Sequence, residues 1–138
     1  GEGLNVRDWL YVEDHVKAID TIFHNGKKGE TYCVGGNHEM TNVDIVKTII
    51  EVYNHHTSVN IQFEDAVEFI EDPRGGGHDL RYAIDTTKIQ EELGWIPQET
   101  FASGIEKTIE WYLANEEWLN AIVSGEYKDY YIKFYQKS

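Results

Sequence analysis

Four side chains of the sequence are of types that bind phosphate: Arg7, Asn42, Arg74 and His78. A guanidinium suits a diphosphate because its planar fork donates two parallel charge-assisted hydrogen bonds. Arg74 and His78 lie in the loop EDPRGGGHD, whose three successive glycines let the backbone approach a ligand closely. Asn42 lies near the expected start of a helix, where backbone N–H groups can receive a phosphate. The sequence therefore predicts a site for a phosphorylated ligand.

Two of these residues are open to simpler interpretations. Arg7, in RDWLYVEDH, could form a surface ion pair with Asp8 or Glu13, which would contribute little to stability. The segment VGGNHEMTN, which contains Asn42, has two glycines after an expected strand. It lacks the further spaced glycine of a dinucleotide-binding loop, so the residues alone favour a tight turn.

Neither a metal site nor a catalytic residue is expected from the residue types. The histidine clusters have no recognised ligand spacing, and the pair at positions 55 and 56 is expected to end a helix, where cations are favourable. Cys33 lies in an expected strand, where cysteine usually behaves as a small buried apolar residue. The sequence has no GxSxG motif, and its carboxylates are scattered over the outer faces of expected helices. The histidine clusters are His38-Glu39, His55-His56 and His78-Asp79.

Length and charge narrow the class of protein. The 138 residues fit one ordinary domain, and no apolar run approaches the roughly 20 residues that a membrane span requires. The formal net charge of −13, from 25 acidic and 12 basic residues, argues against nucleic acid as a partner. A single cysteine cannot form an internal disulfide, and no signal peptide is recognisable, so we expect a cytoplasmic protein.

The elements that must position these side chains follow from hydrophobic periodicity, capping residues and turn residues. Asp14 is expected to cap the first helix, Thr41 the second, Asp85 the third and Thr100 the fourth. The predicted helices are 14–25, 41–55, 85–93, one from 100 towards 124, and an aromatic stripe over 127–135. The predicted strands or extended segments are 8–12, 31–34, 58–63 and 81–84.

Several of these segments together resemble the C-terminal part of dTDP-glucose 4,6-dehydratases, nucleotide-sugar enzymes of the extended short-chain dehydrogenase/reductase family. The resemblance covers essentially the whole chain, and its most specific part is GHDLRYAID followed by ELGWIPQETFASGIEKTIEWYLANEEW. It implies an α/β fold of the extended Rossmann type, of which this chain is a C-terminal fragment made mainly of helices with a few short strands. Residues 1–36 then resemble the last helix and strand of the cofactor domain, and residues 37–138 resemble the substrate-binding domain.

The resemblance also implies an activity for the parent enzyme. Such an enzyme retains NAD, oxidises the sugar of dTDP-glucose at C4, eliminates water across C5 and C6, and returns the hydride to C6. The cofactor loop, the Tyr-x-x-x-Lys pair and the acidic pair precede the matched segment in the family. We therefore expect this chain to be inactive alone and to bind no cofactor, and we expect the parent to be a homodimer.

Carried over by position, three residues match family residues near the nucleotide. Arg7 and Asn42 match contacts to the diphosphate region, and His78 matches a residue near the nucleotide. Arg74 is displaced, because this chain reads DPRGGGHD where the family reads DRPGHD. Two alternatives stay open: another nucleotide-sugar epimerase or decarboxylase of the same family, and a non-enzymatic acidic interaction module.

Overall fold

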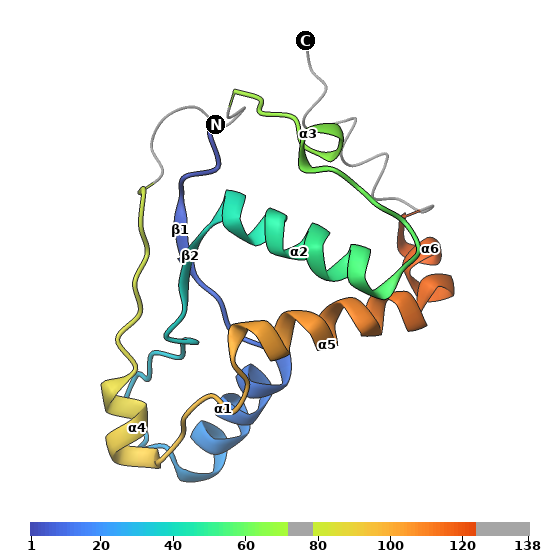
Figure 1. Ribbon diagram of the computed structural model, residues 1–138. Coiled ribbons are helices and arrows are strands. Elements are labelled where there is room, and N and C mark those ends of the chain that lie inside the picture. Colours follow the sequence, from blue (N-terminus) through green and yellow to red (C-terminus); the bar gives the residue numbers. More distant parts are fainter. Residues whose placement is uncertain (72–78, 124–138) are drawn as a thin grey trace.

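The computed structural model of the chain describes residues 1–71 and 79–123. These residues form six helices and two short strands, in agreement with the predicted fragment of mainly helices (Figure 1). None of these helices combines the length and the apolar character needed to cross a bilayer. In chain order the elements are β1 (Val6–Asp8), α1 (Val12–Asn25), β2 (Glu39–Thr41), α2 (Asn42–His56), α3 (Phe63–Ala66), α4 (Thr87–Leu93), α5 (Phe101–Ala114) and α6 (Glu116–Val123).

β1 and β2 form an antiparallel pair in which Arg7 lies opposite Met40. The predicted strand at 8–12 was placed too late, since β1 ends at Asp8. The extended segment predicted at 81–84 does run beside β1: the Val6 N–H donates to the Leu80 carbonyl at 2.7 Å, and a parallel bridge joins Val6 to Arg81. β1 is therefore hydrogen-bonded on both sides.

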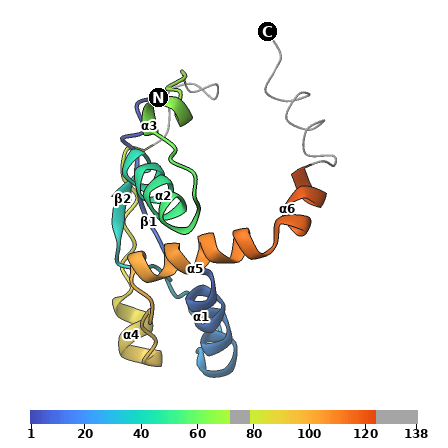
Figure 2. The ribbon, with the colours of Figure 1, turned by 45° about the vertical axis from the view of Figure 1, so that its right-hand side comes forward.

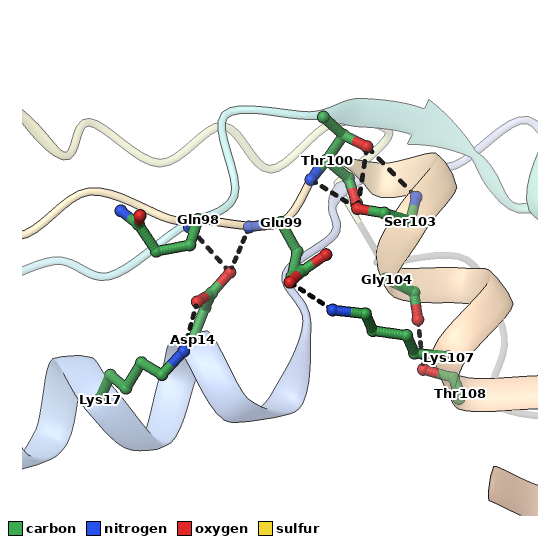
Figure 3. Close-up of polar contacts among 9 residues, drawn as sticks. All are labelled: Asp14, Lys17, Gln98, Glu99, Thr100, Ser103, Gly104, Lys107 and Thr108. Carbon is green, nitrogen blue, oxygen red and sulfur yellow. Dashed lines mark hydrogen bonds and ion pairs between the residues drawn. The ribbon is translucent and has the colours of Figure 1, made fainter.

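Helix α1 begins two residues before the predicted cap. Asp14 lies inside its first turn, is fully buried, and does not cap the helix. One oxygen of its carboxylate accepts the backbone N–H groups of Gln98 and Glu99, at 3.0 and 2.8 Å (Figure 3). Asp14 thus joins α1 to the segment that leads into α5.

The other three caps lie at or next to their predicted positions. The Thr41 hydroxyl accepts the Asp44 N–H, and Thr100 and Ser103 form a reciprocal capping box at the start of α5. Asp85 accepts the Thr87 N–H but lies one residue before the cap position of α4. Two views show α5 between α2 on one side and α1 on the other (Figures 1 and 2).

A small core joins α1 to α4. Ala18, Ile89 and Trp95 are buried together, and α4 ends at Gly94, whose φ of 68° is the left-handed conformation that glycine adopts easily. The residues that pack against this cluster come from both halves of the chain: Leu10, Ile22, Tyr32, Val34 and Leu93. The segments 1–36 and 37–138 therefore share one core in this structure.

Two predicted strands are absent from the described residues. The segment 58–63 is irregular and leads into α3, because the Asn54 side chain bonds both the N–H and the carbonyl of Ile61, at 2.8 Å each. The segment 31–34 contains no strand, and Cys33 is exposed rather than buried. The predicted aromatic helix over 127–135 lies outside the described residues.

Candidate functional site

Arg7 is held between β1 and the segment that follows position 78. Its guanidinium donates to the carbonyl oxygens of Val6 at 2.6 Å, Leu80 at 3.4 Å and Asp79 at 3.4 Å. The plane of Tyr82 supports it from one side, with the guanidinium carbon 4.3 Å from the ring centroid. Carbonyl and aromatic contacts orient the group without neutralising its charge.

No carboxylate pairs with Arg7 in residues 1–71 and 79–123, so neither surface pair considered above is formed. Asp8 instead accepts the backbone N–H groups of Gly36 and His38, at 2.8 and 2.7 Å. Among the described residues the guanidinium of Arg7 is therefore not paired with a carboxylate, which is a property that an anion site needs.

The other described arginine is already paired. Arg81 grips both carboxylate oxygens of Glu39, with N–O distances of 2.5 and 2.7 Å. The hydrogen bond and the charge of Glu39 raise the pKa of the Arg81 guanidinium above its ordinary value. Arg7 and Arg81 lie on neighbouring extended segments, and Arg7 is the one whose charge is left for a ligand.

Asn42 directly follows β2, the strand that pairs with β1 and therefore with Arg7. Its backbone N–H donates to the Asn5 carbonyl, and the next N–H, of Val43, donates to Gly3. Because Thr41 takes the third N–H of α2, the backbone at this helix start is not free for a phosphate. The Asn42 side chain is exposed and makes no hydrogen bond within the described part of the chain, so a ligand would meet the amide itself.

Arg74 and His78 lie outside the described residues, in the gap at 72–78. Their neighbour Asp79 is described, and its carbonyl accepts from both Arg7 and the Asn5 side chain, at 3.4 and 3.5 Å. Asp79, the last residue of the predicted loop, therefore lies next to Arg7.

The pair Gly35-Gly36 does not form a phosphate cradle. A Cβ atom at Gly36 would overlap the Trp9 carbonyl, and one at Gly35 would overlap the Asp8 carboxylate. These glycines are needed for close packing against the β1–α1 connection, so the backbone there is not open to a ligand. The turn does not fit the pyrophosphate of a dinucleotide such as NAD.

A cavity of about 1200 Å³ lies between α5 and the β1–α1 connection, and sequence reasoning did not identify it. The Trp9 indole N–H on its wall is buried and has no hydrogen-bond partner in the described structure. Lys107 and Glu99 form an ion pair at 2.5 Å on the same wall (Figure 3). Each partner shifts the other, so the pKa of Glu99 is lowered and that of Lys107 is raised. The aromatic lining residues are far apart in sequence: Trp9, Tyr11, Phe101, Trp111 and Tyr112.

Comparison with known proteins identifies relatives of this chain. The family model of GDP-mannose 4,6 dehydratase matches residues 1–108. The dTDP-glucose 4,6-dehydratase of Shigella flexneri is 46% identical over 136 residues, and that of Neisseria meningitidis serogroup B is 42% identical over 132. These matches cover 99% and 93% of this chain. The chain spans 37% of the length of each of these curated relatives.

Solved structures agree with these matches. The dTDP-glucose 4,6-dehydratase from Bacillus anthracis in complex with NAD has a TM-score of 0.74 and 46% identity. DesIV, the dTDP-glucose 4,6-dehydratase from Streptomyces venezuelae with NAD and TYD bound, has a TM-score of 0.74 and 36% identity. Each match covers 86% of this chain and 34% of the solved chain. The fold class and the resemblance inferred from the sequence are thereby confirmed.

Proposed function

The chain belongs to the GDP-mannose 4,6 dehydratase family, and from this premise we propose that it is the C-terminal, substrate-binding part of an NAD-dependent dTDP-glucose 4,6-dehydratase. The proposed parent is a lyase that converts dTDP-glucose to dTDP-4-keto-6-deoxyglucose. The observation that carries the proposal is Arg7, an oriented guanidinium without a carboxylate partner in the described structure, next to the loop that contains His78.

In this proposal the chain binds the diphosphate of the nucleotide-sugar. Arg7 donates a pair of hydrogen bonds to phosphate oxygens, and its charge compensates part of the charge of the diphosphate. The Asn42 amide adds a neutral donor from the start of α2. Arg74 and His78, which lie outside the described residues, are proposed as further contacts to the nucleotide.

NAD supplies hydride transfer in the parent and is bound by residues outside this chain. The only glycine pair that follows the β1–α1 unit in the described structure is filled by Trp9 and Asp8, as shown above. We therefore assign no catalytic residue to the chain, and we expect it to be inactive alone. Its contribution is to hold the sugar nucleotide in place while other residues perform the oxidation and the elimination of water.

An apolar face of α1 supports the presence of a further domain in the parent. Val12, Val16, Ile19 and Phe23 recur at helical spacing and are 57% to 82% exposed. A face of this kind is normally covered. We propose that the cofactor domain covers it, that residues 1–36 belong to that domain and 37–138 to the substrate domain, and that the shared core of Ala18, Ile89 and Trp95 is where the two domains pack together. We further propose a cytoplasmic homodimer that has neither nucleic acid nor a membrane as partner.

Calorimetric titration of the chain with dTDP tests this function, with inorganic pyrophosphate as the control anion. We expect dTDP to bind at least about tenfold more tightly than pyrophosphate, because base and sugar add contacts that a simple anion lacks. A chain that binds neither ligand, or binds both equally, contradicts a nucleotide site and favours the acidic interaction module.

A second measurement separates the dehydratase from the epimerase or decarboxylase alternatives. The parent enzyme is incubated with dTDP-glucose and assayed for the 4-keto-6-deoxy product. Formation of that product supports the dehydratase. An epimerised or decarboxylated sugar would instead support another activity of the same family.

A further inference from the structure

Three potential metal ligands meet where the last turn of α2 contacts α5. The two nitrogens of His56 face two carboxylates: Nε2 lies 3.4 Å from Glu106 Oε1, and Nδ1 lies 3.9 Å from Glu110 Oε1. One ligand atom from each residue can be chosen so that all three lie within 4.8 Å of one another. Glu106 and Glu110 are four residues apart, so they lie on the same face of α5.

We propose that His56, Glu106 and Glu110 bind a divalent transition-metal ion such as zinc. Imidazole nitrogen with carboxylate oxygen is a donor set that suits zinc, whereas magnesium and calcium prefer oxygen ligands throughout. Tetrahedral zinc with bonds of roughly 2.0–2.1 Å needs ligand atoms about 3.4 Å apart. The separation of His56 Nε2 from Glu106 Oε1 already has this value.

The surroundings of His56 agree with this assignment. Its Nε2 atom is buried and has no hydrogen-bond partner in the described structure, although the side chain as a whole is 21% exposed. Its neighbour Glu106 Oε1, 3.4 Å away, is a carboxylate oxygen and has no proton to donate to it, so a metal ion between the two atoms would satisfy both. The two glutamates also repel each other at this spacing, and a cation between them removes that repulsion.

The exposure of the glutamates determines what kind of site this is. Their side chains are 53% and 55% exposed, so the remaining coordination positions of the ion are open to water. Such an ion would tie the end of α2 to the middle of α5, and those helices pack against each other (Figure 2). Asn42 and His56 are the first and last residues of α2, roughly 21 Å apart at 1.5 Å per residue. The metal site is therefore separate from the proposed nucleotide site, and either can fail without the other.

Zinc titration of the tag-free 138-residue chain at pH 7.5, followed by calorimetry and by thermal unfolding, tests the proposal. We expect one zinc ion per chain and a higher unfolding temperature, since a ligand at a hundredfold excess over its Kd raises the ratio of folded to unfolded chain about 100-fold. E106Q and E110Q should each weaken zinc binding by at least about tenfold, because each removes one charged ligand while leaving an exposed side chain of the same size.

The matched control is His24, which lies 3.4 Å from Asp20 within α1 and has no second carboxylate partner among the described residues. H24A should bind zinc as tightly as the unchanged chain, and H56A should lose the site. The proposal is overturned if the unchanged chain does not bind zinc at millimolar concentration. It is also overturned if E106Q and E110Q bind zinc as tightly as the unchanged chain, or if H24A loses as much affinity as H56A.

Discussion

Replacing Arg7 with alanine is the most direct test of the nucleotide site. Two of the three carbonyl contacts of Arg7 are 3.4 Å long, near the limit of a hydrogen bond, so those donors can turn to a phosphate at little cost. A hydrogen bond to a charged group contributes about 1.5–3 kcal/mol. With two such bonds formed and the carbonyl contacts given up, we expect Arg7→Ala to cost about 2 kcal/mol of dTDP binding, or about 30-fold in Kd.

The substitution should have a much smaller effect on folding. Arg7 loses its contact with the Tyr82 ring, which contributes about 0.5–1 kcal/mol when partly exposed. Thermal unfolding without ligand should therefore change by only a few degrees. Arg7→Lys keeps the charge but not the planar fork, so its affinity should lie between those of the unchanged chain and Arg7→Ala.

The assay is calorimetric titration with dTDP at low ionic strength, where charge contributes most. Lys28→Ala is the matched control, because it removes one positive charge from an exposed residue in the α1–β2 connection. If Lys28→Ala weakens binding as much as Arg7→Ala, the effect is one of net charge and not of a site. A Kd for Arg7→Ala within twofold of the unchanged value would refute the role given to Arg7.

Three further predictions concern what positions the site, and urea unfolding followed by circular dichroism measures each of them. Asp14→Ala leaves two backbone N–H groups before α5 without an acceptor and should cost about 2–3 kcal/mol, whereas Asp14→Asn, which keeps one carbonyl oxygen, should cost less. Ile89→Ala opens a cavity in the fully buried core and should cost about 2–5 kcal/mol, while the exposed Val16→Ala should cost much less. The pKa of Glu99 is lowered in the folded chain, so its stabilising effect is present above the ordinary value of 4.5 and is lost as pH falls through the folded pKa. Lys107→Met should therefore make stability less dependent on pH in that acidic range, and an unchanged pH dependence would contradict the pairing.

Features fixed by nearby residues were predictable from the sequence. Thr41 and Thr100 cap helices through N–H groups three residues away, and Gly94 ends α4 through its own φ. Signals of this range depend little on the rest of the fold. The starts of these helices were accordingly predicted to within one or two residues, but the single helix predicted from 100 towards 124 is two helices, because α5 ends at Ala114 and α6 begins at Glu116.

Features that depend on distant residues were missed. Aspartate is a common helix-capping residue, but the carboxylate of Asp14 accepts hydrogen bonds from backbone N–H groups 84 and 85 residues later. The alternating pattern at 58–63 suggested a strand, yet Asn54 takes both backbone groups of Ile61. The candidate metal ligands His56, Glu106 and Glu110 are likewise some fifty positions apart and show no motif. No local pattern contains this information, because tertiary contacts override propensity.

The surroundings of Arg7 are relevant to the proposal that a chain with a net charge of −13 holds an anion. Two carboxylates of the strand pair that carries Arg7 are engaged by other groups: Asp8 accepts two backbone N–H groups, and Glu39 is paired with Arg81. Exposed charges farther away than about 10 Å are largely screened at ordinary ionic strength. We therefore expect a ligand at Arg7 to depend on this guanidinium, which has no carboxylate partner among residues 1–71 and 79–123, more than on the total charge. In the proposed site Arg7 would bind the ligand, and Arg81, because it pairs with Glu39, would keep that carboxylate from competing with the ligand for Arg7.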